Sequence, residues 1–165
     1  MKQLKTLLIA ALVFMSTSQV NAQAKVAHVD TNAIMAAMPE MLQAQKQLET
    51  LQGVYDKEFK GMVDEYQAKL AKYNQEVETV TEAMNIERSK EIQDMEKRIQ
   101  DYRQTAQKEL TKKEEDLMKP LMEKTKVAIE KVGKAKGYQY VLNSAGLLLA
   151  DGPDLTPDVK KELGF

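Results

Sequence analysis

Side chains that usually carry out chemistry are scarce in this sequence. It has no cysteine, so it offers no thiol nucleophile, no disulfide and no cysteine-ligated zinc site. His28 is its single histidine, which is too few for a multi-histidine metal centre. The carboxylates lie along helical segments at spacings that favour ion pairs with Lys or Arg. We therefore expect a protein that is not an enzyme and that has no metal or other cofactor.

What remains for binding is a set of Met and Tyr side chains along the middle of the chain. Such side chains are adaptable, as weak binding of many apolar partners requires. The candidate client-binding residues are Met62, Tyr66, Tyr73, Met84, Met95 and Tyr102. They also fall on apolar stripes, so they could form the seam between two helices. Both roles can hold, because a two-helix arm cannot fully bury its stripe.

Two long helices must position these residues. From Leu48 to Met84 the larger apolar residues recur every three or four positions, with a mean spacing near 3.6, which indicates one stripe on a straight α-helix. A second stripe runs from Ile92 to Ala135. The two stripes favour an antiparallel pair, with its turn between Thr79 and Arg88. From this tip to Pro120 the arm should be roughly 50 Å long.

Three residues within the predicted helices are candidate hinges. Gly53 and Gly61 are weak helix formers, so they either let the arm flex or allow close packing against a bulky side chain. Pro120 removes a helical hydrogen bond, and a kink is expected near it.

The ends of the chain predict a small β-containing body. Residues 25–30 favour a strand, Thr31 or Asn32 can cap the next helix, and Pro39 suits the first turn of the long helix. Residues 138–142 and 147–150 favour two strands joined as a hairpin by a turn at 143–146. Thr156 is expected to cap a last short helix.

A body this small is marginal alone, and oligomerisation is the usual remedy when cysteines and metals are missing. The expected oligomer interface consists of strand residues: Val26, Val29, Tyr138, Tyr140, Leu142, Leu147 and Leu149.

The first 22 residues predict a cleaved signal peptide. Lys2 and Lys5 precede an apolar run at 7–15, and small residues at Val20 and Ala22 suit cleavage before Gln23. The run is too short to span a bilayer. The expected divisions are therefore the signal peptide (1–22), a body (23–40), a helical arm (41–119) and the rest of the body (120–165).

Charge argues against a nucleic-acid partner. Without Lys2 and Lys5 the mature chain has 22 basic and 25 acidic residues, whereas nucleic-acid binders usually carry a basic excess. The expected tip, residues 74–87, contains four glutamates and no basic residue.

The order of these parts resembles the Skp/OmpH family of periplasmic chaperones. The matching stretches are 25–30, 137–144 and 154–161, and the resemblance covers the whole mature chain. It implies a mostly α-helical, jellyfish-like homotrimer, in which a short-stranded β-barrel body carries long antiparallel helical hairpins around a cavity. It further implies a periplasmic holdase that shields unfolded outer-membrane proteins without ATP, and leaves room for transient contact with the membrane surface. The best-known members are strongly basic, and this chain is not.

Two other classes of function stay open. One is an enzyme in the β-rich body, although the sequence offers no Cys, no His pair and no phosphate-binding Gly loop. The other is a structural protein. A long hairpin could belong to a structural or adaptor coiled-coil protein of the cell envelope, although such adaptors normally carry a lipoyl-like domain beside the hairpin, and none is visible. Holdase activity on an unfolded barrel would separate the chaperone from the structural protein.

Overall fold

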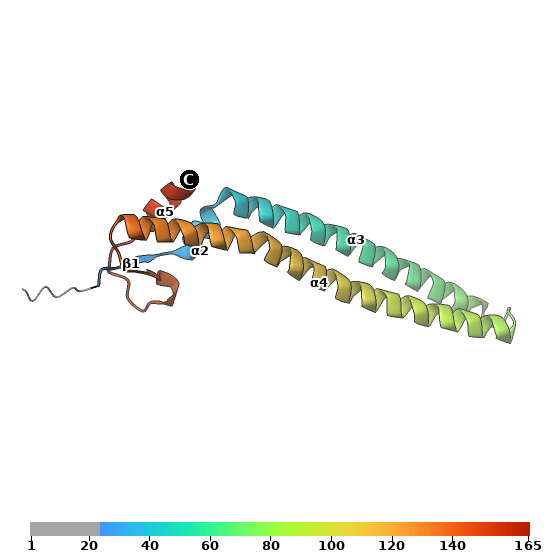
Figure 1. Ribbon diagram of the computed structural model, residues 1–165. Coiled ribbons are helices and arrows are strands. Elements are labelled where there is room, and N and C mark those ends of the chain that lie inside the picture. The colour runs from blue at the N-terminus through green and yellow to red at the C-terminus, as the bar shows by residue number, and fades with distance from the viewer. Residues whose placement is uncertain (1–23) are drawn as a thin grey trace, which may run out of the picture.

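A long helical hairpin projects from one end of a small body in the computed structural model, which describes residues 24–165 (Figure 1). The expected signal peptide and its cleavage point lie outside these residues. In chain order the elements are β1 (Val26–Val29), α2 (Thr31–Ala37), α3 (Pro39–Glu76), α4 (Glu82–Ala135), β2 (Tyr140–Asn143), the short 3-10 helix η1 (Ser144–Gly146) and α5 (Thr156–Leu163).

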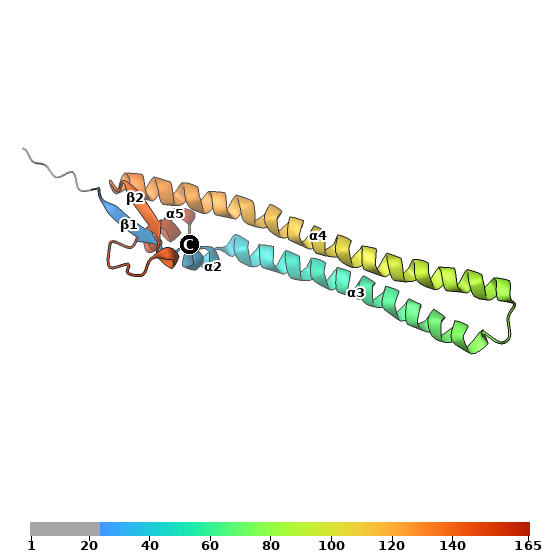
Figure 2. The ribbon, with the colours of Figure 1, turned by 90° about the horizontal axis from the view of Figure 1, so that it is seen from below.

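The arm is the antiparallel pair of α3 and α4, which lie side by side in both views (Figures 1 and 2). As the sequence predicts, α3 begins at Pro39, whose missing N–H costs nothing at the first helical position. α4 runs unbroken through Pro120 for 54 residues, about 80 Å at 1.5 Å per residue. Its last turns therefore belong to the body and the rest to the arm.

The turn at the tip lies earlier than expected, at residues 77–81, and Asn85 is not part of it. Thr81 caps α4, because its hydroxyl oxygen accepts a hydrogen bond from the backbone N–H of Met84. Asn85 lies in the first turns of α4, and its side-chain amide donates to the Val77 carbonyl at 3.0 Å. This bond closes the turn, which explains why a weak helix former occurs there.

The body contains two parallel strands, and the expected hairpin is wrong. β2 pairs with β1 in the register Val26 to Tyr140 and Val29 to Asn143, and Figure 2 shows the two strands side by side. After β2 the Asn143 side chain accepts from the N–H of Ala145 and starts the 3-10 turn. Residues 147–150 form no strand, because strand preference alone cannot hold a segment that lacks a pairing partner.

Two helix caps also differ from expectation. Asp30, not Thr31 or Asn32, caps α2, and its carboxylate accepts from the N–H of Ala33 at 2.8 Å. Thr156 is the first residue of α5 rather than its cap. Its buried hydroxyl donates to the Asp154 carboxylate and accepts from the Asp30 N–H at 2.8 Å, so it ties the C-terminal segment to the start of α2.

The core lies where α4 crosses the body. Its main cluster joins both terminal regions of the chain to the end of α4, and consists of Ala27, Val29, Ile34, Ala128, Val132, Leu155 and Val159. A second cluster of Met38, Ala44 and Leu121 lies at the root of the arm. α4 and β2 approach so closely that a Cβ on Gly133 would lie 2.9 Å from a Val141 methyl group, and Gly137, at φ +76°, turns the chain out of α4.

Candidate functional site

Four tyrosines cross the seam of the arm. Each phenol donates a hydrogen bond to a glutamate of the opposite helix, and the pairs are Tyr55–Glu109, Tyr66–Glu96, Tyr73–Glu91 and Tyr102–Glu58. The rings of Tyr55 and Tyr102 meet edge to face, with centroids 6.1 Å apart. This tyrosine–glutamate ladder favours the observed register of the two helices, because each phenol donates to a carboxylate of the opposite helix.

The ladder holds its phenols in the protonated form. Partial burial and the hydrogen bond to Glu58 raise the pKa of Tyr102 to about 12. The hydrogen bonds to Glu96 and Glu91 raise the pKa values of Tyr66 and Tyr73. Lys69, followed by Tyr73, lowers the pKa of Glu91 by hydrogen bonding to its carboxylate. The phenols therefore act as donors rather than as acids or bases.

The structure separates the six candidate client-binding residues. Met95 is buried in the seam, and the three tyrosines are half-buried with their hydroxyls bonded to glutamates. Met62 is half-buried. Met84 is exposed near the tip. The arrangement leaves ring edges and thioethers accessible along the arm, and their role in binding stays a prediction.

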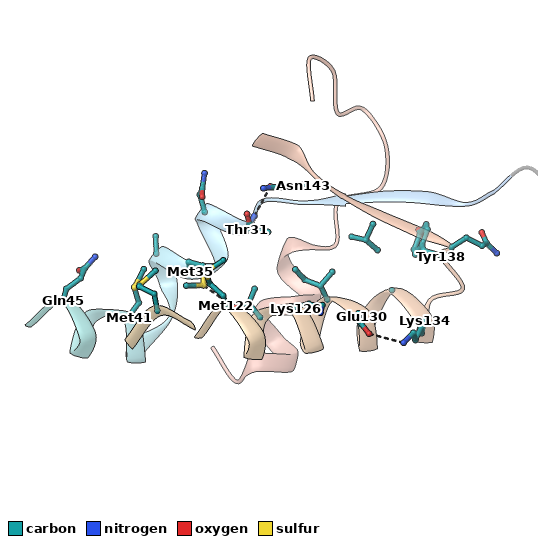
Figure 3. A pocket seen from close by; sticks show the side chains of 18 residues that line it. Thr31, Met35, Met41, Gln45, Met122, Lys126, Glu130, Lys134, Tyr138 and Asn143 are labelled. Carbon is teal, nitrogen blue, oxygen red and sulfur yellow. Dashed lines mark hydrogen bonds and ion pairs between the residues drawn. The ribbon is translucent and has the colours of Figure 1, made fainter. Parts of the chain in front are cut away.

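A broad apolar groove of about 830 Å³ lies where the arm meets the body. Figure 3 shows Met35, Met41 and Met122 gathered where α2, α3 and α4 meet, with Tyr138 towards the opposite end. Met118, one turn before Met122 on α4, completes the methionine set. Charged and amide side chains, among them Lys126, Glu130, Lys134 and Asn143, also line the groove.

The groove walls are held by polar contacts between elements. The Thr125 hydroxyl donates to the thioether sulfur of Met35 at 3.3 Å. Lys124 on α4 forms an ion pair with Glu40 at the start of α3 and lowers the pKa of the Glu40 carboxyl. These contacts join α2 and α3 to α4, and Met35 and Met41 also pack against the second core cluster. Met122 is exposed, and its polarizable side chain can adapt to an apolar guest.

Sequence reasoning missed the four groove methionines, and the only candidate site residue in the groove is Tyr138, which was expected at the oligomer interface. The methionines come from three helices that meet only in the folded chain. One local signal was present: Met118 and Met122 are four residues apart on either side of Pro120, and Met38 and Met41 are three residues apart on either side of Pro39. Of these, Met38 is fully buried in the core and cannot contact a guest.

Four of the seven expected interface residues are exposed. Val26, Tyr140, Leu142 and Leu149 are exposed, while Tyr138 and Leu147 are half-buried. Val29 is instead 2% exposed and packs in the main core of its own chain. Leu148, which was not on the expected surface, is fully exposed.

The lining of the groove is more apolar than polar. Within residues 24–165 no group of three or more His, Cys, Asp or Glu side chains is placed to hold a metal ion. Over the same range no helix is both long and apolar enough to cross a membrane.

The hinge candidates lie in open positions of the arm. A Cβ added to Gly53 or Gly61 would meet no atom within 4 Å. Close packing inside the chain therefore does not explain either glycine, and the hinge role stays a prediction. Pro120 is exposed on α4, directly before the buried Leu121.

Comparison with known proteins gives a consistent result. The family model described as "Outer membrane protein (OmpH-like)" matches residues 25–163. Among solved structures, a crystal structure described as a candidate OmpH-like outer membrane chaperone from Caulobacter crescentus CB15 superposes with a TM-score of 0.76. The two chains are 17% identical, and the match covers 86% of this chain and 85% of that one. No curated protein matches the chain.

Proposed function

Because this chain belongs to the Skp/OmpH family of OmpH-like proteins, we propose that it is a periplasmic holdase chaperone for unfolded outer-membrane proteins. In this proposal it works without ATP, and the signal peptide that directs it to the periplasm is cut before Gln23. The body (23–40 and 120–165) assembles copies of the chain, and the arms (41–119) surround the client.

The methionine-lined groove is the observation that best supports this function. An unfolded outer-membrane strand alternates apolar and polar residues, and it must be held without being trapped. Flexible thioethers give many small contacts that re-form as the client moves. The groove opens at the root of the arm, where a client between the arms would also reach the Met and Tyr side chains along the seam.

Self-association is the second part of the proposal. In this proposal the two parallel strands of each chain join those of the other copies in a small β-barrel. The simplest such assembly is a trimer. The exposed side chains of Val26, Tyr140, Leu142 and Leu149 would then be covered by neighbouring copies.

Aggregation of an unfolded outer-membrane barrel provides the test. When the barrel is diluted from urea, the mature chain should suppress light scattering without ATP, and labelled barrel should report the affinity by fluorescence. Met118→Gln combined with Met122→Gln should weaken that affinity about tenfold or more, because apolar contact area is lost. The control is Leu42→Gln, an exposed apolar residue on α3 that does not line the groove.

Two results would count against this function. If the barrel aggregates equally with and without the protein, the holdase role fails and an adaptor role becomes the better explanation of the long arm. If Leu42→Gln weakens binding as much as the double variant, the groove is not the binding site.

A further inference from the structure

The tip of the arm exposes apolar side chains that the hairpin does not need for closure. Val77 in the turn is 47% exposed, and Met84 and Ile86 in the first turns of α4 are 45% and 67% exposed. The turn itself is closed by polar groups, namely the caps from Thr81 and Asn85. The three apolar side chains are therefore free to contact another molecule.

Carboxylates without partners surround these apolar side chains. Glu78, Glu82 and Glu87 are exposed and form no ion pair with any residue of the described chain. Glu76 is different, because it pairs with Arg88 at 2.6 Å. Residues 74–87 contain four glutamates and no Lys or Arg, and with the neighbouring Arg88 and Lys90 counted the tip still has two more acidic than basic residues.

A shallow groove beside the tip contains a hydrogen-bond donor that has no acceptor among the described residues. It has a volume of about 390 Å³ and is lined by residues that include Tyr73, Val77 and Arg88. The Arg88 guanidinium stacks on the Tyr73 ring at 4.5 Å and bonds to Glu76 through Nη2. Its Nη1 is buried and has no acceptor among residues 24–165. A backbone carbonyl is an acceptor that any extended polypeptide supplies.

We propose that the arm tip is a docking surface for a polypeptide segment or protein surface that carries Lys or Arg beside apolar side chains. The apolar contacts would bury Val77, Met84 and Ile86, and the partner's cations would face Glu78, Glu82 and Glu87. An anionic lipid surface is disfavoured because like charges repel, and the same repulsion opposes tip-to-tip contact between copies. The inference does not rest on the proposed holdase function, since it concerns only the tip.

Labelled peptides and the full mature chain test this surface by fluorescence anisotropy. One peptide alternates Lys and Val, and a matched peptide alternates Glu and Val. Glu78→Gln, Glu82→Gln and Glu87→Gln together should weaken binding of the lysine peptide about tenfold at 0.1 M salt, since three exposed charge pairs are lost. The lysine peptide should bind far less tightly at 1 M salt, where charges are screened within about 3 Å.

The matched control makes the same change of charge elsewhere on the arm. Glu114→Gln, Glu115→Gln and Asp116→Asn remove three exposed charges from α4 far from the tip in sequence, and should leave lysine-peptide binding within about twofold. A second variant, Met84→Ser with Ile86→Ser, keeps the charges and should also weaken binding. Circular dichroism verifies that every variant is as helical as the parent.

The proposal is overturned if both triple variants lose affinity equally, because binding would then follow net charge alone. It is also overturned if the glutamate peptide binds as well as the lysine peptide. Vesicles of phosphatidylglycerol or phosphatidylcholine that bind the parent but not the tip variants would assign the surface to lipid instead. Because suppression of barrel aggregation is measured separately, failure here leaves the holdase proposal standing.

Discussion

The four tyrosines of the ladder explain how a thin arm keeps one register. Apolar stripes alone would allow the two helices to shift by one turn with little loss of packing energy, because Leu, Met and Ala side chains can replace one another in the contact. A phenol bonded to a particular glutamate does not tolerate that shift. These bonds lie at the edge of the seam, so the apolar ring packs inward while the hydroxyl stays close to water.

Glu91 gives the ladder a dependence on pH. Its pKa is lowered by hydrogen bonds, first from Lys69 and then from Tyr73, so folding favours its ionised form. The stabilisation is present above the unfolded pKa near 4.5 and is lost as pH falls through the lower folded value. We expect the melting temperature to fall between pH 6 and pH 3, and to fall less in Glu91→Gln, which cannot titrate.

Thermal melts followed by circular dichroism at each pH measure this difference. Glu115→Gln is the matched control, because Glu115 is exposed on the same helix and forms no ion pair among the described residues. Parallel pH profiles for the parent and Glu91→Gln would show that the Lys69–Glu91–Tyr73 contact contributes nothing to stability.

Single residues were the least predictable part of the chain. Asp30, Thr31 and Asn32 are adjacent and all can cap a helix, so sequence alone could not choose among them. Thr156 precedes a Pro and therefore resembles a cap. Its hydroxyl instead accepts a hydrogen bond from the backbone N–H of Asp30, which is 126 positions away. The glutamate partners of the tyrosines depend on the register of two helices, which no local pattern encodes.

At the scale of elements, the two arm helices were predictable because their apolar period is dense and local. α3 and α4 cover the expected stripes, and the two stripes predicted the antiparallel pair. Strand pairing depends on partners distant in sequence, so β2 was assigned to a hairpin with its neighbour when it pairs with β1. For the same reason the methionine groove, built from three helices, could not be foreseen as one site.

Gly53 and Gly61 allow a test of stiffness within α3. Both are exposed with open space around them, so alanine fits at each without strain. Gly53→Ala with Gly61→Ala should raise the free energy of unfolding by up to about 2 kcal/mol, roughly 1 kcal/mol per site. Amide hydrogen exchange in α3 should slow as well, because local opening becomes rarer.

The reverse change is the control. Ala68→Gly, at an exposed position of the same helix, should cost about 1 kcal/mol and speed exchange. If the double alanine variant exchanges at the parental rate or faster, the glycines do not set the flexibility of the arm, and the hinge hypothesis is wrong.

At the scale of the whole molecule, burial is concentrated at one end. α3 alone extends about 57 Å from the body at 1.5 Å per residue, and the arm it forms buries only single residues such as Met95 and Ala106 along its length. The body has a compact core, and the outer edge of β1 is partly covered, because His28 forms backbone hydrogen bonds with Pro153 and Leu155. Within the described residues β2 has no strand on its other side, so its edge is open to pairing with another chain.

The body surface leads to the prediction that the folded chain is an obligate oligomer, most simply a trimer. Leu148 and Leu149 are 109% and 74% exposed, and Tyr140 in β2 is 58% exposed. A monomer would leave these apolar side chains in water beside the open edge of β2. Sedimentation equilibrium should therefore give the mass of an oligomer at micromolar concentration, and Leu148→Ser with Leu149→Ser should shift it towards smaller species.

Ile86→Ser is the matched control, because Ile86 is similarly exposed but lies in the first turns of α4, at the tip of the arm. It should leave the sedimenting mass unchanged. A folded parental monomer at micromolar concentration would contradict the prediction. In that case the apolar surface of the body would be available to clients, and the arms would not need to close around a cavity for the chain to hold an unfolded barrel.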